Sequence, residues 1–241
     1  MTNHLADLWA ASPRVVVLSG AGMSTDSGIP DFRGPNGVWT KNPGAAAMFD
    51  IQTYLEDPEV RRRAWEGRRQ HAAWTAQPNA GHLALADLQK NGRLGAILTQ
   101  NIDGLHQSAG AVDVIELHGS IWEIECLQCG DRTPTLETMQ RDEPDPRCLK
   151  CGGILKTATI SFGQRLDPVV LDAAITAART ADLLVAIGTS LQVMPAAGLA
   201  EMSRHLAVVN AEPTQYDDQA DLVVRDPIGE VLPEVRDLLA G

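Results

Sequence analysis

Residues 15–34 read VVVLSGAGMSTDSGIPDFRG, and this stretch decides the fold of the chain. Residues 15–18 form a continuous apolar run, which is typical of a parallel strand covered on both faces. Gly20 and Gly22 let the backbone approach a pyrophosphate, and the next segment can present helix N-terminal amides to it. Thr25 stands where a dehydrogenase fingerprint has its third glycine, so an ordinary strand-to-helix turn is the alternative.

The loop after this turn carries Asp31, Phe32 and Arg33 between a proline and a glycine. An aromatic ring and a guanidinium gain little from exposure in a loop unless they cover something. We therefore expect these residues to cover a ligand. The alternative is that Phe32 fills a small core while Asp31 and Arg33 pair with each other.

The composition favours one large aliphatic core and a small appended module. The chain has 241 residues, of which 44% are hydrophobic and only 4% aromatic. Its formal charge of -11 argues against a nucleic-acid or anionic-membrane surface and favours attraction to basic, lysine-rich segments. The chain has no apolar run of about 18 residues and no secretory signal pattern, so we expect a cytoplasmic protein with no membrane association.

Apolar runs typical of buried strands alternate with helical patterns along the chain. This alternation predicts an α/β fold with a Rossmann-like, doubly wound parallel sheet. The expected strands are residues 15–18, 94–98, 183–187, 206–209 and 222–224, with a further apolar run at 112–115. The expected helices are residues 4–11, 58–74, 81–90, 168–180, 195–204 and 229–239.

Residues 125–156 break the alternation, and we interpret them as an insertion. They contain Cys126 and Cys129, then Cys148 and Cys151, each pair separated by two residues. Two such knuckles can form a closed four-thiolate cage for one zinc ion, which leaves no open position and is therefore structural. Redox pairs or an iron–sulfur cluster are alternatives. A nucleic-acid-binding ribbon is disfavoured, because residues 126–151 carry four basic and five acidic side chains.

Polar residues follow three of the expected strands, at the ends that face the ligand crevice of an open parallel sheet. Asn101 and Asp103 can hold a carboxamide or a water, and Ile102 can line the pocket, although an Asx-rich turn is the alternative. Hydroxyls beyond residues 183–187 can donate to phosphates, and polar groups beyond residues 206–209 can hold ribose hydroxyls. These residues are Gly188, Thr189 and Ser190, then Asn210 and Glu212.

His118 lies just before the cysteine module and is a candidate general base, because histidine exchanges a proton near neutral pH. The other histidines compete for this role. We expect solvated or capping positions for them, namely His4, His71, His82, His106 and His205.

Taken together, these motifs resemble the sirtuins, a family of NAD-dependent protein-lysine deacylases. GAGMSTDSGIPDFRG, TQNIDGLH, ELHGS, the cysteine pairs, ISFGQ, GTSLQVMPAAG and VVNAEPT occur in the family's order over about residues 13–233. The resemblance implies a Rossmann-type NAD-binding domain at residues 1–124 and 157–241, with an inserted zinc-binding module at 125–156. It also implies a helical part of the small domain within residues 40–78 and a tunnel for acyl-lysine side chains of protein substrates. No oligomeric state is implied.

The resemblance also implies roles for individual residues. His118 would be the general base, assisted by Asn101, and Phe32 would shield the reactive sugar carbon. Asn101, Ile102 and Asp103 would form the nicotinamide pocket. The rest of the NAD site would comprise Gly20, Ala21, Gly22, Asp31, Arg33, Gln100, Gly188, Thr189, Ser190, Asn210, Glu212 and Ile228. The substrate would contact Thr159, Ile160, Ser161, Phe162, Gly163 and Val193.

Two positions depart from the family pattern. Gln164 replaces a glutamate after Phe162-Gly163, so a charge near the substrate cleft is lost. Members that remove acidic acyl groups carry a Tyr-x-x-Arg pair, whereas this chain has Trp65 and Arg68. Arg68 could pair with a succinyl carboxylate, but the arginines around it more often form a solvated helix face. We expect deacetylation, with desuccinylation or protein ADP-ribosylation as alternatives, and regard an NAD-sensing module or a dehydrogenase as weaker readings.

Overall fold

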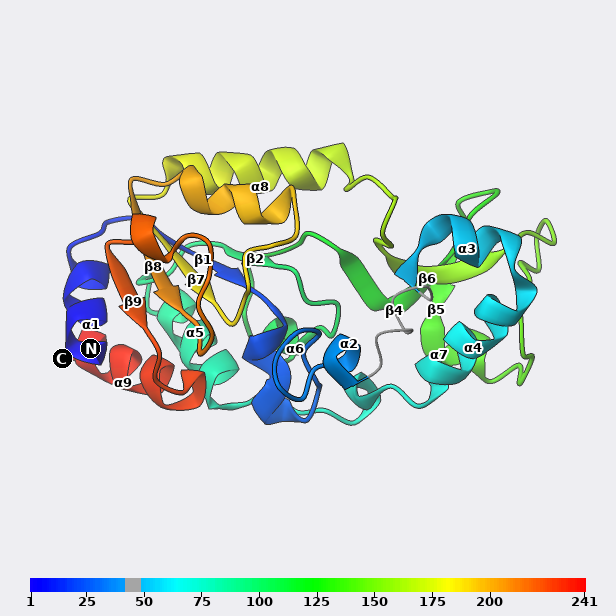
Figure 1. The fold of residues 1–241 in the computed structure, drawn as a ribbon, viewed down its shortest axis with the longest axis horizontal. Helices are drawn as coiled ribbons and strands as arrows, with labels where there is room; N and C mark the ends of the chain where they lie inside the picture. Colours follow the sequence, from blue (N-terminus) through cyan, green and yellow to red (C-terminus); the bar gives the residue numbers. More distant parts are fainter. Residues whose placement is uncertain (42–48) are drawn as a thin grey trace.

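The protein is described by a computed structural model that covers residues 1–41 and 49–241 (Figure 1). Its larger sheet has six parallel strands in the order β3-β2-β1-β7-β8-β9. The strands are β1 Val15–Ser19, β2 Ile97–Thr99, β3 Val114–Glu116, β7 Leu183–Ile187, β8 His205–Val209 and β9 Leu222–Val224. The strand order reverses direction at β1 and β7, which is the point where doubly wound folds bind ligands.

Helices cover both faces of this sheet, and alternate residues of β1 face the two layers. Val17 packs in one core with α1 Thr2–Ala10, α5 Ala80–Lys90 and α9 Ile228–Ala240. Leu18 packs in the other with α8 Pro168–Thr180 and the 3-10 helix η4 Ala196–Glu201. Figure 1 shows α8 above the sheet, α5 and α9 below it, and α1 at the left beside α9. The predicted parallel sheet is therefore confirmed.

A second sheet of three antiparallel strands, in the order β5-β4-β6, lies at the opposite end of the molecule (Figure 1). It comprises β4 Gly119–Cys126, β5 Arg132–Pro134 and β6 Leu155–Thr159, with α7 Thr135–Met139 beside it. The sheet thus extends beyond residues 125–156 at both ends. The division into domains stays a prediction, and residues 42–48 of the expected helical part lie outside the described residues.

Two helices, α3 Ile51–Glu56 and α4 Pro58–Arg69, are attached to this small sheet. Trp65 of α4 is fully buried against Ile124 and Leu155. Arg61 is also buried, and its Nε donates to Asp145 Oδ2 at 3.0 Å. The expectation of a solvated arginine face is therefore wrong for Arg61, because this guanidinium joins α4 to the cysteine segment.

Several element boundaries differ from those expected. The helix expected at residues 58–74 ends at Arg69, and Ala72–Trp74 forms a separate 3-10 turn, η3, which is capped by His71. Of residues 195–204, only Ala196–Glu201 is helical, and it forms the 3-10 helix η4 rather than an α-helix; Gly198 lowers its helix propensity and no side chain caps its start. The strand expected at residues 94–98 begins only at Ile97.

The remaining short elements lie in loops. They are η1 Ala21–Ser27, α2 Val38–Lys41, α6 Leu105–Ser108 and η5 Asp217–Gln219. The segment after the glycine turn is therefore helical, as a 3-10 helix. Within the described residues, no helix combines the length and the apolarity that a membrane span needs.

Candidate functional site

The two glycine loops of the site meet at the carboxyl ends of β1 and β7. Gly20 donates to Ile187 O at 3.0 Å, and Gly22 donates to Gly188 O at 2.8 Å. A Cβ atom at Gly20 would lie 2.7 Å from Thr189 Cβ, so a larger residue would push the loops apart. Gly188 has φ +60°, a conformation that favours glycine. Ala21 and Ser190 flank this contact, and both are half-buried.

The hydroxyl of Thr189 connects the β7 loop to the β2 loop. It accepts one hydrogen bond from Gln100 Nε2 at 2.9 Å and another from Leu191 N at 3.2 Å. Leu191 has φ +52°, and Gln215 Nε2 donates to its carbonyl at 2.6 Å. Among the described residues Thr189 Oγ1 donates no hydrogen bond, so its proton is available to a ligand acceptor.

Asn101 and Asp103 are buried beside Gly20, and Ser24 joins them. Asn101 Nδ2 donates to Gly20 O at 3.0 Å and to Ser24 Oγ at 3.2 Å. Ser24 Oγ donates to Asp103 Oδ2 at 2.7 Å, and Leu105 N donates to Asp103 Oδ1 at 2.9 Å. In the part of the chain that the structure describes, the amide oxygen of Asn101 accepts no hydrogen bond, so it can accept from a ligand; half-buried Ile102 lies beside it. Our sequence analysis missed Ser24, although it lies in the glycine motif.

His118 is half-buried between the two sheets, just before β4. Its Nδ1 lies 3.0 Å from Gln100 O. Because a carbonyl oxygen can only accept, Nδ1 must carry the proton, and Nε2 is left with a free lone pair. Burial lowers the pKa of His118 below its usual value, and the bond to Gln100 opposes this shift. The neutral ring is therefore prepared to take up a proton at Nε2.

The loop after β8 lies at the same edge of the sheet. Asn210 Nδ2 donates to Glu212 O at 2.7 Å, and Arg225 Nη1 donates to Asn210 O at 2.7 Å. Arg225 also forms an ion pair with Asp217. Ile228 begins α9 and packs against the core beside Met23. We did not predict Arg225, because nothing in its local sequence distinguishes it from a surface arginine.

The Asp31-Phe32-Arg33 segment folds against aromatic side chains. Asp31 Oδ1 accepts from Gly34 N at 2.9 Å. The Phe32 ring lies 4.9 Å from the Trp39 ring, and the Arg33 guanidinium lies 4.5 Å from the Trp39 centroid. Within the described residues, Asp31 and Arg33 form no ion pair. The local Asp31–Arg33 pairing considered as an alternative is therefore wrong.

The segment from Thr159 to Gly163 passes beside His118. Ile160 N donates to His118 O at 2.9 Å, and Phe162 N donates to Phe49 O at 2.7 Å. Phe162 is 44% exposed, and its ring lies 5.7 Å from that of Trp39. Ser161 N is bound by Gln164 Oε1 at 2.9 Å, so the amide that replaces the expected charge closes its own turn. Gly163 is exposed, and half-buried Val193 lies in the loop after β7.

The four cysteines form a compact cluster that fits a zinc ion. Their Sγ atoms all lie within 4.8 Å of one another. Cys126 and Cys151 are 3.5 Å apart at sulfur, and Cys129 and Cys148 are 3.7 Å apart. A tetrahedral ion with Zn–S bonds of about 2.3 Å needs sulfurs separated by about 3.8 Å. These separations exclude disulfides, and the closed set of thiolates suits one structural zinc.

Two further histidines lie beneath the site: His82 caps α5, as expected, whereas His106 is buried and neither solvated nor capping. His106 is 1% exposed, and its Nε2 lies 2.9 Å from Ser19 Oγ. His82 is fully buried with its ring 4.9 Å from that of His106, although it does take part in a capping box with Asn79. Burial lowers the pKa of His82 to about 4 and that of His106 to about 3.

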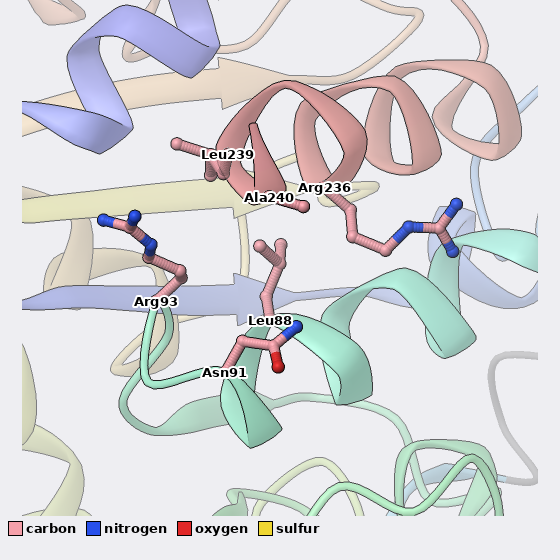
Figure 2. A pocket seen from close by; sticks show the side chains of 6 residues that line it. All are labelled: Leu88, Asn91, Arg93, Arg236, Leu239 and Ala240. Carbon is pink, nitrogen blue, oxygen red and sulfur yellow. The ribbon is translucent and has the colours of Figure 1, made fainter.

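Two shallow, open cavities lie away from this site. One, of about 320 Å³, lies between α5 and α9, where Arg93 and Arg236 point away from each other (Figure 2). The other, of about 310 Å³, lies beside the start of β1. Divergent guanidinium groups cannot bind one anion together, so the first cavity is not an anion site built from these two arginines.

Comparisons with known proteins agree with this geometry. A model described as the Sir2 family matches residues 20–195. A relative from Streptomyces coelicolor, named NAD-dependent protein deacetylase 2, is 54% identical over 230 residues, covering 92% of this chain and 95% of the relative. A Cutibacterium acnes relative, named NAD-dependent protein deacetylase, is 44% identical over 241 residues, covering 97% of each chain.

Solved structures have the same fold. One, described as Sir2 with a p53 peptide and NAD+, aligns with a TM-score of 0.89 and 33% identity over 98% of each chain. Another, a Sir2 variant described with a deacetylated p53 peptide and 3′-O-acetyl ADP-ribose, gives a TM-score of 0.91 at 34% identity, covering 98% of this chain and 97% of that one.

Proposed function

The chain belongs to the Sir2 family and is an NAD-dependent protein deacetylase, and we propose that it uses His118 as its general base. In this proposal the enzyme cleaves the nicotinamide bond of NAD. With one water molecule consumed, it transfers the acetyl group of a lysine side chain to ADP-ribose, which gives nicotinamide, O-acetyl-ADP-ribose and free lysine. The single observation that carries the base assignment is the bond between His118 Nδ1 and Gln100 O, because it leaves Nε2 free.

The cofactor fits the donors at the edge of the sheet. The close glycine loops and the free proton of Thr189 suit the pyrophosphate, and Asn210 with Glu212 suits the ribose hydroxyls. Asn101 and Asp103 would hold the carboxamide of nicotinamide. NAD bound there would supply an electron-poor sugar carbon once nicotinamide leaves, and the acyl oxygen of the lysine amide would attack this carbon.

The protein's own residues prepare this reaction. His118 Nε2 takes a proton from a ribose hydroxyl, and proton transfer of this kind contributes about 10² to 10⁴-fold in rate. Phe32, held against Trp39, would exclude nicotinamide and water from the reacting carbon. The segment from Thr159 to Gly163 would pair with the substrate backbone as an added strand.

The structure favours the acetyl group over the succinyl group as the modification that the enzyme removes from lysine side chains of protein substrates. Trp65 is fully buried in the small core, so it cannot contact an acyl chain. The Arg68 guanidinium lies 4.9 Å from the Trp65 ring and is within 3.3 Å of both Tyr54 Oη and Thr157 Oγ1. Because these partners occupy Arg68, they support deacetylation over desuccinylation. A cytoplasmic location also belongs to this proposal, since the cluster needs reduced thiols.

The test is mass spectrometry of the products formed from NAD and a peptide, using acetyl-lysine and succinyl-lysine forms of one sequence. We expect nicotinamide and O-acetyl-ADP-ribose, with faster turnover of the acetyl form. Free acetate with intact NAD would contradict the proposed mechanism. Label from NAD retained on protein would favour ADP-ribosylation, and faster turnover of the succinyl form would reverse the acyl preference.

A further inference from the structure

A tryptophan at the irregular part of β4 contacts the loop that contains Asp103. β4 pairs with β6 at Gly119↔Thr159 and again at Ile124↔Thr157, with a register shift between these two pairs. Five steps along β4 therefore lie opposite two steps along β6. Bulged segments of this kind redirect side chains, often beside functional sites. Trp122 lies within this segment.

The redirected segment binds two successive carbonyls of the loop. Ile121 N donates to Ile102 O at 3.0 Å, and Trp122 Nε1 donates to Asp103 O at 2.7 Å. Thr135 Oγ1 of α7 donates in turn to Ile121 O at 2.6 Å. Hydrogen bonds thus connect the small sheet to Asp103, whose carboxylate accepts a hydrogen bond from Ser24.

The indole of Trp122 also covers the peptide that follows Asp103. Gly104 has φ +75°, and a Cβ atom there would lie 2.9 Å from Trp122 Nε1. Trp74 packs edge-on against Trp122, with ring centroids 5.1 Å apart, and donates from Nε1 to Arg68 O at the end of α4. Trp122 therefore packs against Trp74, which is bonded to the end of α4, and donates a hydrogen bond to the loop that contains Asp103.

We propose that Trp122 is a positioning residue for nicotinamide, acting through the Asp103–Gly104 peptide. This inference rests on the proposed nicotinamide pocket at Asn101 and Asp103. When the indole bond is absent, the loop spends less time in the conformation that places both side chains. Apparent affinity falls in proportion to that fraction, and by the same factor for every ligand that needs the pocket.

The test compares zinc-loaded parent enzyme with Trp122→Phe, which keeps an aromatic ring but removes the N–H donor. We expect the KM for NAD and the inhibition constant for nicotinamide to rise together, by about three- to tenfold, the range of one hydrogen bond. ADP-ribose lacks nicotinamide, so its dissociation constant should change less than twofold. kcat at saturating NAD should also change less than twofold.

Trp9→Phe is the matched control, because Trp9 Nε1 donates to Arg93 O at 2.7 Å far from the site. It should lower the melting temperature and leave all four constants within twofold of the parent. Trp74→Leu supplies a second variant that leaves the loop bond intact, and a smaller rise in the same two constants is expected.

Two results would overturn the proposal. Unchanged NAD and nicotinamide constants in Trp122→Phe would show that the indole bond does not position the pocket. An equal loss of ADP-ribose affinity would show general destabilisation instead. A parent enzyme that forms no nicotinamide from NAD and acetylated peptide would instead contradict the proposed function itself.

Discussion

The large and small sheets of this protein are stabilised by different means. All five residues of β1 and all five of β7 are buried, so aliphatic packing on both faces holds the large sheet. Among the described residues, the small core consists of Trp65, Ile124, Leu155 and two cysteines, with partly buried Met139 packed against them. A core of that size rarely folds alone without a metal or disulfides. His118 lies between the sheets, so its position depends on both kinds of stability.

Removal of zinc should produce the largest difference in stability between the small and the large sheet. We expect chelation to disorder residues 119–159 and abolish turnover, because structural zinc binding contributes about 10 kcal/mol or more to folding. Hydrogen exchange should rise in β4, β5 and β6 while β1 and β7 stay protected. Restored protection after zinc is added back is the control. Equal exchange in both sheets would show that the regions fold as one unit.

Replacement of His118 tests the residue at the junction without disturbing either region. We expect His118→Ala to lower turnover by about 10² to 10⁴-fold, since it removes the base. Zinc content and hydrogen exchange should match the parent. His4→Ala is the control, because His4 is exposed on α1. Turnover of His118→Ala within tenfold of the parent would contradict the assignment.

One isoleucine-to-alanine substitution in each core measures how much that core contributes to stability. Ile97 of β2 and Ile124 of β4 are both fully buried. Each change to alanine should cost about 2–5 kcal/mol through lost burial and a residual cavity. Ile97→Ala should lower the denaturant midpoint of the large sheet, and Ile124→Ala should weaken zinc retention against a chelator. If both variants lower the denaturant midpoint and the zinc retention by equal amounts, the two cores are not stabilised independently.

The central strands of the large sheet could be predicted well because they are buried on both faces. Residues 183–187 match β7 at both ends, since all five are apolar and buried. Residues 222–224 also match the edge strand β9, although only Val224 is buried there. Residues 195–204 were predicted as an α-helix from a pattern that cannot distinguish it from a 3-10 helix. The cysteine spacing predicted its cluster, because the ligand types themselves define the geometry.

The rest of the site depends on contacts between distant segments. Nothing near Trp122 in the sequence signals a register shift in β4 or a bond to Asp103. Arg61 looked like one of several solvated arginines, yet Asp145, 84 residues away, holds it in a buried ion pair. His82 and His106 each follow a turn, and only the fold brings their rings together. The local sequence around a residue does not indicate which distant residues it will contact in the fold.

Acid stability sharpens the comparison further, because the buried histidine pair belongs to the large-sheet region. Burial lowers the pKa of His82 to about 4 and that of His106 to about 3, from an ordinary value of 6.5. The unfolded chain therefore binds more protons than the folded chain below pH 6.5. Stability is fully present above that pH and is lost as the pH falls toward the folded values.

Between pH 7.5 and 5.5 each histidine should cost about 1.4 kcal/mol of unfolding free energy. His106→Gln keeps a side chain that can bond Ser19, removes one titrating group and should reduce the loss by that amount. His4→Gln, on the exposed face of α1, is the control and should behave as the parent does. Urea unfolding at both pH values, with zinc saturated and β1 followed by hydrogen exchange, measures the difference. Equal acid losses in the parent and in His106→Gln would place the acid sensitivity elsewhere, in the thiolate cluster rather than beneath the large sheet.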